Sequence, residues 1–413
     1  MSKKRKIRIC LYSVITEENQ NRPVERTLFQ RAKNGIWNII SAIKSNYSGN
    51  IFLDEYHSRK IENTNKGDIS IRLSICERIF DIFANFDVDI RQISWGSLND
   101  ESVRDININT DIFIIAGGGY IFLNSDGTTN TRMDDVKFLK SISCKKVAYS
   151  IGLNRLNNET IESLSDISHE TSEKIRQFSR SVDLLSVRDN DSLDLFIENG
   201  CKNVIRTADP ALFLRSKIYN GAIRKKANGI TVGINMACHG RNSIGMLEKS
   251  ISSYVEFLKH INSTHSVYFV YFVHDDIERR IPNYLRSHGI HCDVVDCGPR
   301  ALIDAYRQVD IVINQMLHSC ILAFNAETPI LNISYDKKSH AFLNLFELSD
   351  LFIPCVDVNR EKLILLFEKI LENRNNIVEK IRRGKIKLAQ DMERFDHSLS
   401  EIAEAASHNL AQD

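Results

Sequence analysis

The chain has 413 residues, and its 54 lysines and arginines nearly balance 53 aspartates and glutamates. This length is too great for one ordinary hydrophobic core and predicts two domains, while the balanced charge argues against a generally basic nucleic-acid-binding protein. No stretch approaches the run of about 18 apolar residues that a membrane span needs, and nine scattered cysteines without a C-x-x-C pair indicate neither disulfides nor a zinc site. We therefore expect a cytoplasmic protein without a zinc site or a nucleic-acid partner.

The first half of the chain alternates between strand and helix patterns. Strands are predicted over residues 7–14, 51–56, 111–116, 146–151 and 184–187, and helices over residues 27–45 and from Ser70 onwards. The basic start of the chain has only a short apolar segment and no small-residue cleavage site, so we interpret it as the first strand and not as an export signal. This alternation predicts a Rossmann-like domain over residues 1–215.

Glycine-rich turns stand at two helix or strand ends in this half. In the loop Asn65-Lys66-Gly67-Asp68, Gly67 allows a backbone geometry that other residues resist. Asp68 is either the N-cap of the following helix or a residue that holds a substrate, and the sequence leaves both open. The triplet Gly117-Gly118-Gly119 follows a buried strand and lets the main chain either approach a ligand closely or turn sharply into a helix.

Charged residues follow the last strand of this half. Arg188 either pairs with a neighbouring carboxylate such as Asp189, or provides a planar, permanently charged donor for a carboxylate or phosphate. Asp209 lies in a short Asp-Pro-Ala segment, after which residues 215–228 turn polar and basic. We expect the crossover between domains there.

The second half restarts the same alternation. Strands are predicted over residues 230–235, 267–273, 292–295, 311–314 and 330–333, with helices over 244–261, 277–288, 300–309 and 317–326. The run at 267–273 is apolar throughout, as a central parallel strand buried on both faces should be. A second Rossmann-like domain is therefore predicted over residues 229–350, followed by a helical segment over 351–413 that packs on a domain or crosses between the two.

Polar residues follow the strands of this half as well. His318 falls where a strand gives way to a helix, at the sheet edge where α/β proteins bind ligands. Tyr335-Asp336-Lys337-Lys338 follow the next strand and converge on the same rim, although a capping histidine and a solvated turn would also explain both features. The loop His274-Asp275-Asp276 is expected to contribute at most one side chain, because three adjacent residues rarely point at one metal.

Five of these blocks, in this order, resemble the polysaccharide pyruvyl transferase family. They are NKGD, AGGGY, SVRDNDS, ADPAL and the stretch from MLH to YDKK, within about residues 51–350. The resemblance implies an α/β fold of two Rossmann-like, doubly wound domains facing a cleft, which is a GT-B-like architecture. Because the family's first motif closely follows its first strand, the chain carries an N-terminal addition of about 50 to 60 residues.

The resemblance implies transfer of pyruvate from phosphoenolpyruvate to a sugar of a cell-surface polysaccharide or its precursor, forming a ketal without a cofactor. The acceptor would be a sugar, an oligosaccharide or a lipid-linked saccharide, and peripheral contact with the inner face of the membrane through residues 380–390 is open. His318 would act as acid and base, with Asp68 or Asp209 accepting the hydroxyl proton. The other expected contacts are Arg188, Lys338, Lys337, Gly117, Gly118 and Gly119 for the donor, and Asn65, Gly67 and Tyr335 for the acceptor.

Met316 departs from the family pattern, which has an arginine at this position. Loss of a bidentate cation should weaken anion binding by several kcal/mol unless Lys337 or Arg300 compensates, or the donor differs. Two alternatives are a GT-B glycosyltransferase that uses a nucleotide sugar, for which Glu327 is the candidate ribose ligand, and a non-catalytic member of the same fold.

Overall fold

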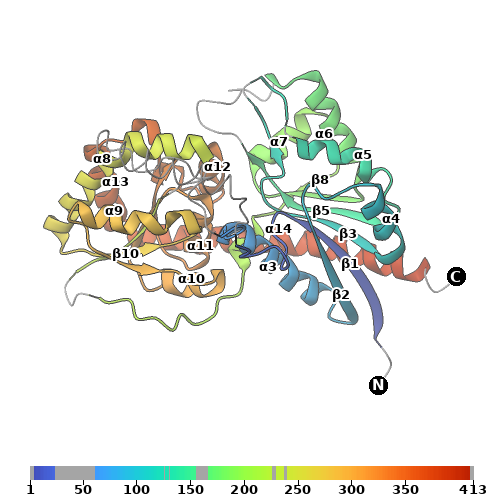
Figure 1. Cartoon of the computed structure of the whole chain (residues 1–413), viewed down its shortest axis with the longest axis horizontal. Helices are drawn as coiled ribbons and strands as arrows, with labels where there is room; N and C mark the ends of the chain where they lie inside the picture. The colour runs from blue at the N-terminus through green and yellow to red at the C-terminus, as the bar shows by residue number, and fades with distance from the viewer. Residues whose placement is uncertain are drawn as a thin grey trace, which may run out of the picture. The chain divides into compact units, whose positions relative to one another are not determined.

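The computed structural model describes residues 4–23, 61–124, 126–129, 131–154, 166–225, 229–236 and 240–409. The chain forms two compact units (Figure 1). Unit 1 comprises Met1–Glu18, Asp68–Leu214 and Arg383–Asp413, and unit 2 comprises Asn19–Gly67 and Arg215–Arg382. The change at Arg215 falls in the polar segment proposed as a crossover, but each unit is built from separated segments. The predicted helix over 27–45 and strand over 51–56 lie outside the described residues.

Unit 1 is built on a six-stranded parallel sheet. Its strands are β1 (Arg5–Ser13), β2 (Phe86–Ser94), β3 (Ile112–Ala116), β5 (Lys145–Ile151), β7 (Leu184–Val187) and β8 (Val204–Arg206). The order is β2-β1-β3-β5-β7-β8, and β4 (Ile121–Phe122) pairs separately with β6 (Leu153–Asn154). The direction of winding reverses between β1 and β3, and ligands of open α/β sheets bind at the carboxyl end of such a switch point.

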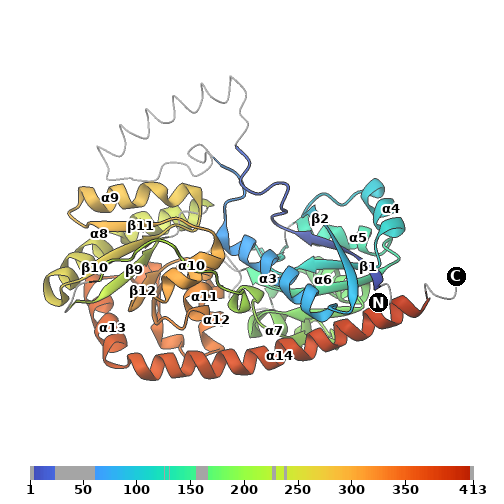
Figure 2. The same cartoon turned by 90° about the horizontal axis from the view of Figure 1, so that it is seen from below.

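Helices cover both faces of this sheet. They are α3 (Lys66–Ile82), α4 (Asp100–Asn109), α5 (Val136–Leu139), α6 (His169–Ser181) and α7 (Asn190–Glu198). Helices α4 to α7 share one apolar core with alternate residues of β1 and β3 and with Ala148 and Ile151 of β5. On the other face the Tyr149 ring lies 4.9 Å from the ring of Phe395, which belongs to the 36-residue helix α14 (Arg374–Asn409) drawn in red in Figure 2. The unit is therefore a layered α/β fold, as predicted.

Unit 2 contains a second six-stranded parallel sheet. Its strands are β9 (Thr231–Asn235), β10 (Tyr268–Phe272), β11 (Cys292–Val295), β12 (Ile311–Asn314), β13 (Ile330–Ser334) and β14 (Phe352–Pro354). The order β11-β10-β9-β12-β13-β14 is the 3-2-1-4-5-6 order of a Rossmann fold. Its switch point lies between β9 and β12, so the carboxyl end of β12 is the expected place for a ligand.

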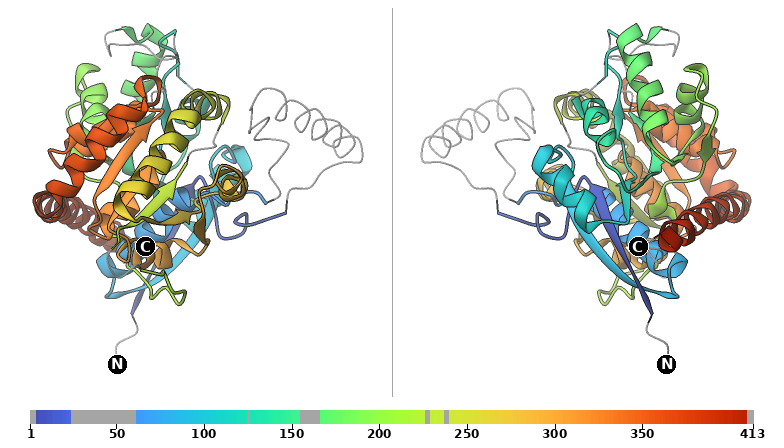
Figure 3. Two further views of the ribbon diagram at one scale, coloured as in Figure 1. Left: turned by 90° about the vertical axis from the view of Figure 1, so that its left-hand side faces the viewer. Right: turned by 90° about the vertical axis from the view of Figure 1, so that its right-hand side faces the viewer.

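The helices of unit 2 are α8 (Gly240–His265), α9 (Ile281–Ser287), α10 (Pro299–Tyr306), α11 (Leu317–Asn325), α12 (Lys337–Asn344) and α13 (Arg360–Glu372). Helices α8 and α13 pack side by side (Figure 3), with the rings of Phe257 and Phe367 5.8 Å apart. The prediction of two Rossmann-like, doubly wound units is confirmed. Among the described helices, none is long and apolar enough to cross a membrane.

Candidate functional site

The imidazole of His318 lies against the main chain of Gly67 in unit 2. Strand β12 ends at Asn314 and α11 begins at Leu317, so His318 stands in the first helical turn at the switch point. A Cβ atom on Gly67 would lie 2.0 Å from Nδ1 of His318 and 2.2 Å from its Cγ. Only glycine leaves room for the ring, so the structure brings together two residues that the sequence predicted for the site.

The segment that carries Gly67 is fastened to the carboxyl edge of the unit 2 sheet. The Lys66 amide donates to the carbonyl oxygen of His274 (2.9 Å), and its ammonium lies 2.8 Å from Oδ1 of Asp296. The hydroxyl of Thr64 donates to Asp275 (2.6 Å). Burial opposes ionisation of Asp296, yet the Lys66 ammonium lowers its pKa. These contacts fix the backbone on which the His318 ring rests, and this role of Lys66 was not predicted from the sequence.

A buried network lies beside His318 in the same unit. Nε2 of His274 is 2.7 Å from the Tyr306 hydroxyl, which is 2.8 Å from Oγ of Ser319, the residue after His318. The backbone N–H of His274 donates to Glu278. His274 is therefore an interior residue, and among the described residues no three His, Cys, Asp or Glu side chains are grouped to hold a metal ion.

The lysine pair lies at the end of β13, the neighbour of β12. Asp336 caps α12 by accepting from the Lys338 amide (2.8 Å), and its other oxygen is 3.4 Å from the Lys338 ammonium. That ammonium also lies 5.6 Å from the Tyr335 ring, whose pKa is raised by burial. Lys337 and Lys338 are half-exposed on this edge. Met316, by contrast, is only 3% exposed, so its thioether packs into the interior of unit 2.

The glycine triplet of unit 1 turns sharply at the carboxyl end of β3. Gly117 and Gly118 have φ angles of +51° and +73°, which favour glycine. At Gly119, a Cβ would lie 1.8 Å from Nδ2 of Asn154, which donates to the Gly119 carbonyl oxygen. The triplet therefore brings the main chain close to β5, where the Gly117 amide donates to the Tyr149 carbonyl oxygen (2.8 Å), and to Asn154 of β6, while its predicted role in donor binding stays a prediction.

Arg188 lies at the end of β7 and is only 4% exposed. Its Nη1 is 3.3 Å from Asp209, and its Nε is 3.5 Å from Asp189. A Cβ on Gly152 would lie 2.2 Å from that Nε, so glycine makes room for the guanidinium. Burial raises the pKa of Asp189, against the opposing charge of Arg188. The predicted role of Arg188 in donor binding stays a prediction.

Helix α3 begins at Lys66, before the start near Ser70 that the sequence predicted. The side chain of Asn65 accepts from the Gly67 amide (2.9 Å) and caps this helix start. Asp68 therefore stands in the first turn and is half-exposed. Its carboxylate would lie 4.0 Å from a Cβ on Gly118 in unit 1.

Sequence reasoning missed Arg132 and Trp95 at this edge of unit 1. The Arg132 guanidinium lies over the indole of Trp95, 4.6 Å from the ring centroid, and donates to the Gly119 carbonyl oxygen (2.9 Å). Arg132 belongs to a 3-10 helix, η1 (Thr131–Asp135), and does not follow a strand. The one signal in the sequence is its closeness to the glycine triplet.

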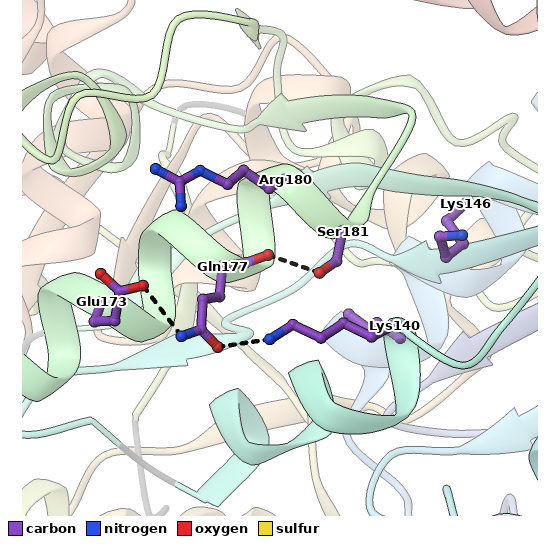
Figure 4. A pocket seen from close by; sticks show the side chains of 7 residues that line it. Lys140, Lys146, Glu173, Gln177, Arg180 and Ser181 are labelled. Atoms are coloured by element: carbon purple, nitrogen blue, oxygen red, sulfur yellow. Dashed lines mark hydrogen bonds between the residues drawn. The ribbon is translucent and has the colours of Figure 1, made fainter.

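A separate cavity of about 460 Å³ lies at the amino-terminal edge of the same sheet, beside the start of β5. Figure 4 shows that Gln177 links two of its lining residues, accepting from Lys140 and donating to Glu173. Lys146 donates to backbone carbonyl oxygens. None of the predicted site residues lines this cavity.

Two Rossmann-like units, each with polar residues at the carboxyl edge of its parallel sheet, define a protein with a GT-B-like fold. The fold is similar to that of a solved protein from Listeria monocytogenes described as a candidate UDP-N-acetylglucosamine 2-epimerase. That similarity has a TM-score of 0.50 at 11% identity and covers 91% of this chain and 90% of the other. The model of the family described as polysaccharide pyruvyl transferase matches residues 65–337, and the chain belongs to this family. It is thus a transferase.

Another similar structure is a UDP-forming α,α-trehalose-phosphate synthase from Burkholderia xenovorans, with a TM-score of 0.45 at 10% identity over 97% of this chain and 99% of the other. No curated protein sequence matches the chain.

Proposed function

We propose that the chain transfers the pyruvyl group of phosphoenolpyruvate to two hydroxyls of one sugar in a cell-surface polysaccharide or its precursor. The methylene carbon C3 gains a proton, the two hydroxyl oxygens bond in turn to C2, and the C2–O bond to phosphate breaks. Of the two hydroxyl protons, the balance places one on C3 and one on the released phosphate. The products are a cyclic pyruvate ketal and inorganic phosphate.

His318 is the proposed proton donor and acceptor, and its contact with Gly67 is the observation that carries the proposal. Histidine changes its charge near neutral pH, as transfer to C3 and from a hydroxyl requires. The ring stands at a helix start on the switch point of a Rossmann sheet and rests on a fastened backbone. A fixed imidazole at this edge supports acid-base chemistry more than a capping role.

The cations proposed for the donor in unit 2 are Lys337 and Lys338, which are half-exposed beside β12. In unit 1 the amides of the glycine triplet are proposed as donor contacts, and Asp68 as acceptor of a hydroxyl proton. Arg188 already forms an ion pair with Asp209. We therefore propose that this pair holds the backbone at the carboxyl edge of the unit 1 sheet in position. Asn65 and Gly67 would shape the acceptor side by holding the start of α3.

The nucleotide-sugar alternative depends on Glu327, whose position does not suit it. Glu327 follows the last turn of α11 and precedes β13, so it lies at the sheet edge opposite His318. It has a φ of +62° and pairs with Arg382 at 2.7 Å. No nucleotide site at the His318 edge can use this carboxylate.

We propose that the reaction takes place in the cytoplasm, at or near the inner face of the membrane if the acceptor is lipid-linked. The described cysteines are unpaired, which suits a reducing compartment. The peripheral membrane contact proposed from the basic segment rests on composition alone.

Incubation with phosphoenolpyruvate and a panel of free, oligomeric and lipid-linked sugars tests the proposal. Phosphate release should depend on the acceptor, and carbon NMR should show a ketal carbon derived from labelled C2. His318→Gln should abolish both. Release of nucleotide from a parallel panel of nucleotide sugars, without a ketal, would favour the glycosyltransferase instead, while activity in neither panel would favour the non-catalytic alternative.

A further inference from the structure

The guanidinium of Arg132, at the carboxyl edge of the unit 1 sheet, has no role in the reaction proposed above. Arg132 is half-exposed, lies 4.6 Å from the centroid of the Trp95 ring and donates from Nη1 to the Gly119 carbonyl oxygen. With the residues that the structure describes, this guanidinium makes no further hydrogen bond and no ion pair within 4 Å. We propose that Arg132, supported by Trp95, binds a carboxylate or phosphate group of a substrate at this edge.

Comparison with Arg188 shows why Arg132 is the better anion-binding residue. Arg188 is 4% exposed and lies 3.3 Å from Asp209 and 3.5 Å from Asp189, so its charge is already neutralised by two carboxylates. An anion could reach it only by displacing a buried partner. Arg132 offers its remaining N–H groups without that cost, and its planar fork matches a carboxylate or phosphate.

Two carboxylates act on Arg132 without pairing with it. Asp68 and Asp135 both favour its charged form, although burial lowers the pKa of the guanidinium overall. Asp135 is engaged elsewhere, because it accepts from the hydroxyl of Tyr12 at 2.6 Å. Asp68 is half-exposed beside the same turn. A bound anion would therefore lie next to Asp68, the residue proposed to accept a hydroxyl proton.

The indole beneath Arg132 is held rigidly. Its Nε1–H donates to the Tyr12 carbonyl oxygen at 3.0 Å, and its ring meets Tyr120 edge-on at 5.2 Å. A Cβ on Gly118 would lie 3.3 Å from Cη2 of Trp95, so the glycine triplet leaves room for this ring. An arginine stacked on a fixed aromatic ring loses little side-chain entropy when it binds an anion.

The chemical class of the ligand rests on the proposed function. Phosphoenolpyruvate carries both a carboxylate and a phosphate, and a precursor acceptor can carry a phosphate of its own. Both sources share the chemistry that a half-exposed guanidinium recognises. Binding measured without turnover can separate them.

Trp95 provides the signal for that measurement, because the chain has only two tryptophans. In a Trp37→Phe background, tryptophan fluorescence reports on Trp95 alone. Titration with phosphoenolpyruvate, pyruvate, inorganic phosphate and a sugar phosphate should give a saturable change with at least one of them. A response to phosphoenolpyruvate or pyruvate assigns the site to the donor, and a response to the sugar phosphate alone assigns it to the acceptor.

Arg132→Met should weaken the responding ligand by roughly 10- to 100-fold, the loss expected for a charged hydrogen-bonded contact. Arg132→Lys keeps the positive charge but lacks the planar guanidinium, so its affinity should lie between those of Arg132→Met and the parent protein. Arg180→Met, at an exposed position on α6 beside the amino-terminal edge, is the matched control and should bind as the parent does. Equal affinity in Arg132→Met and the parent, or no response to any of the four anions, overturns the inference.

The result separates this inference from the proposed reaction. Anion binding that depends on Arg132, without ketal formation, would support the anion-binding site and refute the proposed pyruvyl transfer. If Arg132→Met forms the ketal with an unchanged KM for both substrates, the proposed reaction is supported and the proposed binding role of Arg132 is refuted. Circular dichroism and thermal unfolding of both the Arg132→Met and the Arg132→Lys variants show whether a lost response reflects misfolding.

Discussion

Replacing Gly67 by alanine tests whether the His318 ring acts from the position in which it rests. The new Cβ would lie 2.0 Å from Nδ1 of His318 and 2.6 Å from its Cβ. Carbon and nitrogen need about 3.4 Å, so the ring must move by roughly 1.4 Å or the fastened segment must shift with it. A displacement of about 1 Å can cost 100-fold in rate, which is about 2.7 kcal/mol of activation free energy. We expect kcat for ketal formation to fall by about this factor, while overpacking costs about 1–3 kcal/mol of stability.

The assay combines kcat from phosphate release with a carbon NMR titration of the His318 imidazole. Gly298→Ala is the matched control in the same unit, because no atom lies within 4 Å of its Cβ position and its φ is −63°. It should keep the parent kcat and the parent titration. A folded Gly67→Ala protein with full kcat and an unshifted His318 resonance would refute the assignment of this contact to catalysis.

Three further predictions concern the surroundings of the site. Gly152→Ala places a Cβ 2.2 Å from Nε of Arg188 and should lower the unfolding free energy in urea by about 3 kcal/mol through the disturbed buried ion pairs; an unchanged value would contradict it. Burial raises the pKa of Asp135 above its ordinary value of 3.8. The protonated carboxyl therefore contributes fully to the free energy of unfolding below pH 3.8, and this contribution is lost as the pH rises through the pKa of the folded state. Asp135→Asn should remove that part of the pH dependence of denaturant unfolding, and parallel pH profiles would speak against it. A double-mutant cycle of Lys66→Met and Asp296→Asn, measured by denaturant unfolding, should give a coupling free energy of about 1 kcal/mol. Additive effects would show that this ion pair does not stabilise the segment that carries Gly67.

The buried parallel strands could be predicted because their side chains are apolar on both faces. The predicted bounds of residues 311–314 coincide with β12, whose four residues are all buried. The predicted bounds of residues 292–295 coincide with β11, although this edge strand has only one fully buried residue, Val295. Strand β2 was not predicted, although Phe86, Val88 and Ile90 alternate with Asp87, Asp89 and Arg91; it lies at the edge of its sheet, and none of its side chains is fully buried.

The candidate site was predictable in its residue types but not in its contacts. Gly67 and His318 each belong to a motif, yet their contact depends on residues 61–67 joining unit 2 while the next residue joins unit 1. No local periodicity encodes that division. Arg132 was missed for a related reason, since it comes from a short 3-10 helix and gains its place only through Trp95 and Gly119.

Helix α14 has a consequence for the order of events during biosynthesis. The helix contributes Tyr149's neighbour Phe395, together with Asp396, which accepts from the Tyr149 hydroxyl at 2.5 Å. These residues follow Arg382, the last residue of unit 2. On the ribosome, every segment of unit 2 is therefore translated before residues 383–409 of unit 1. Until then the sheet face around Tyr149 lacks the part of its covering that α14 provides.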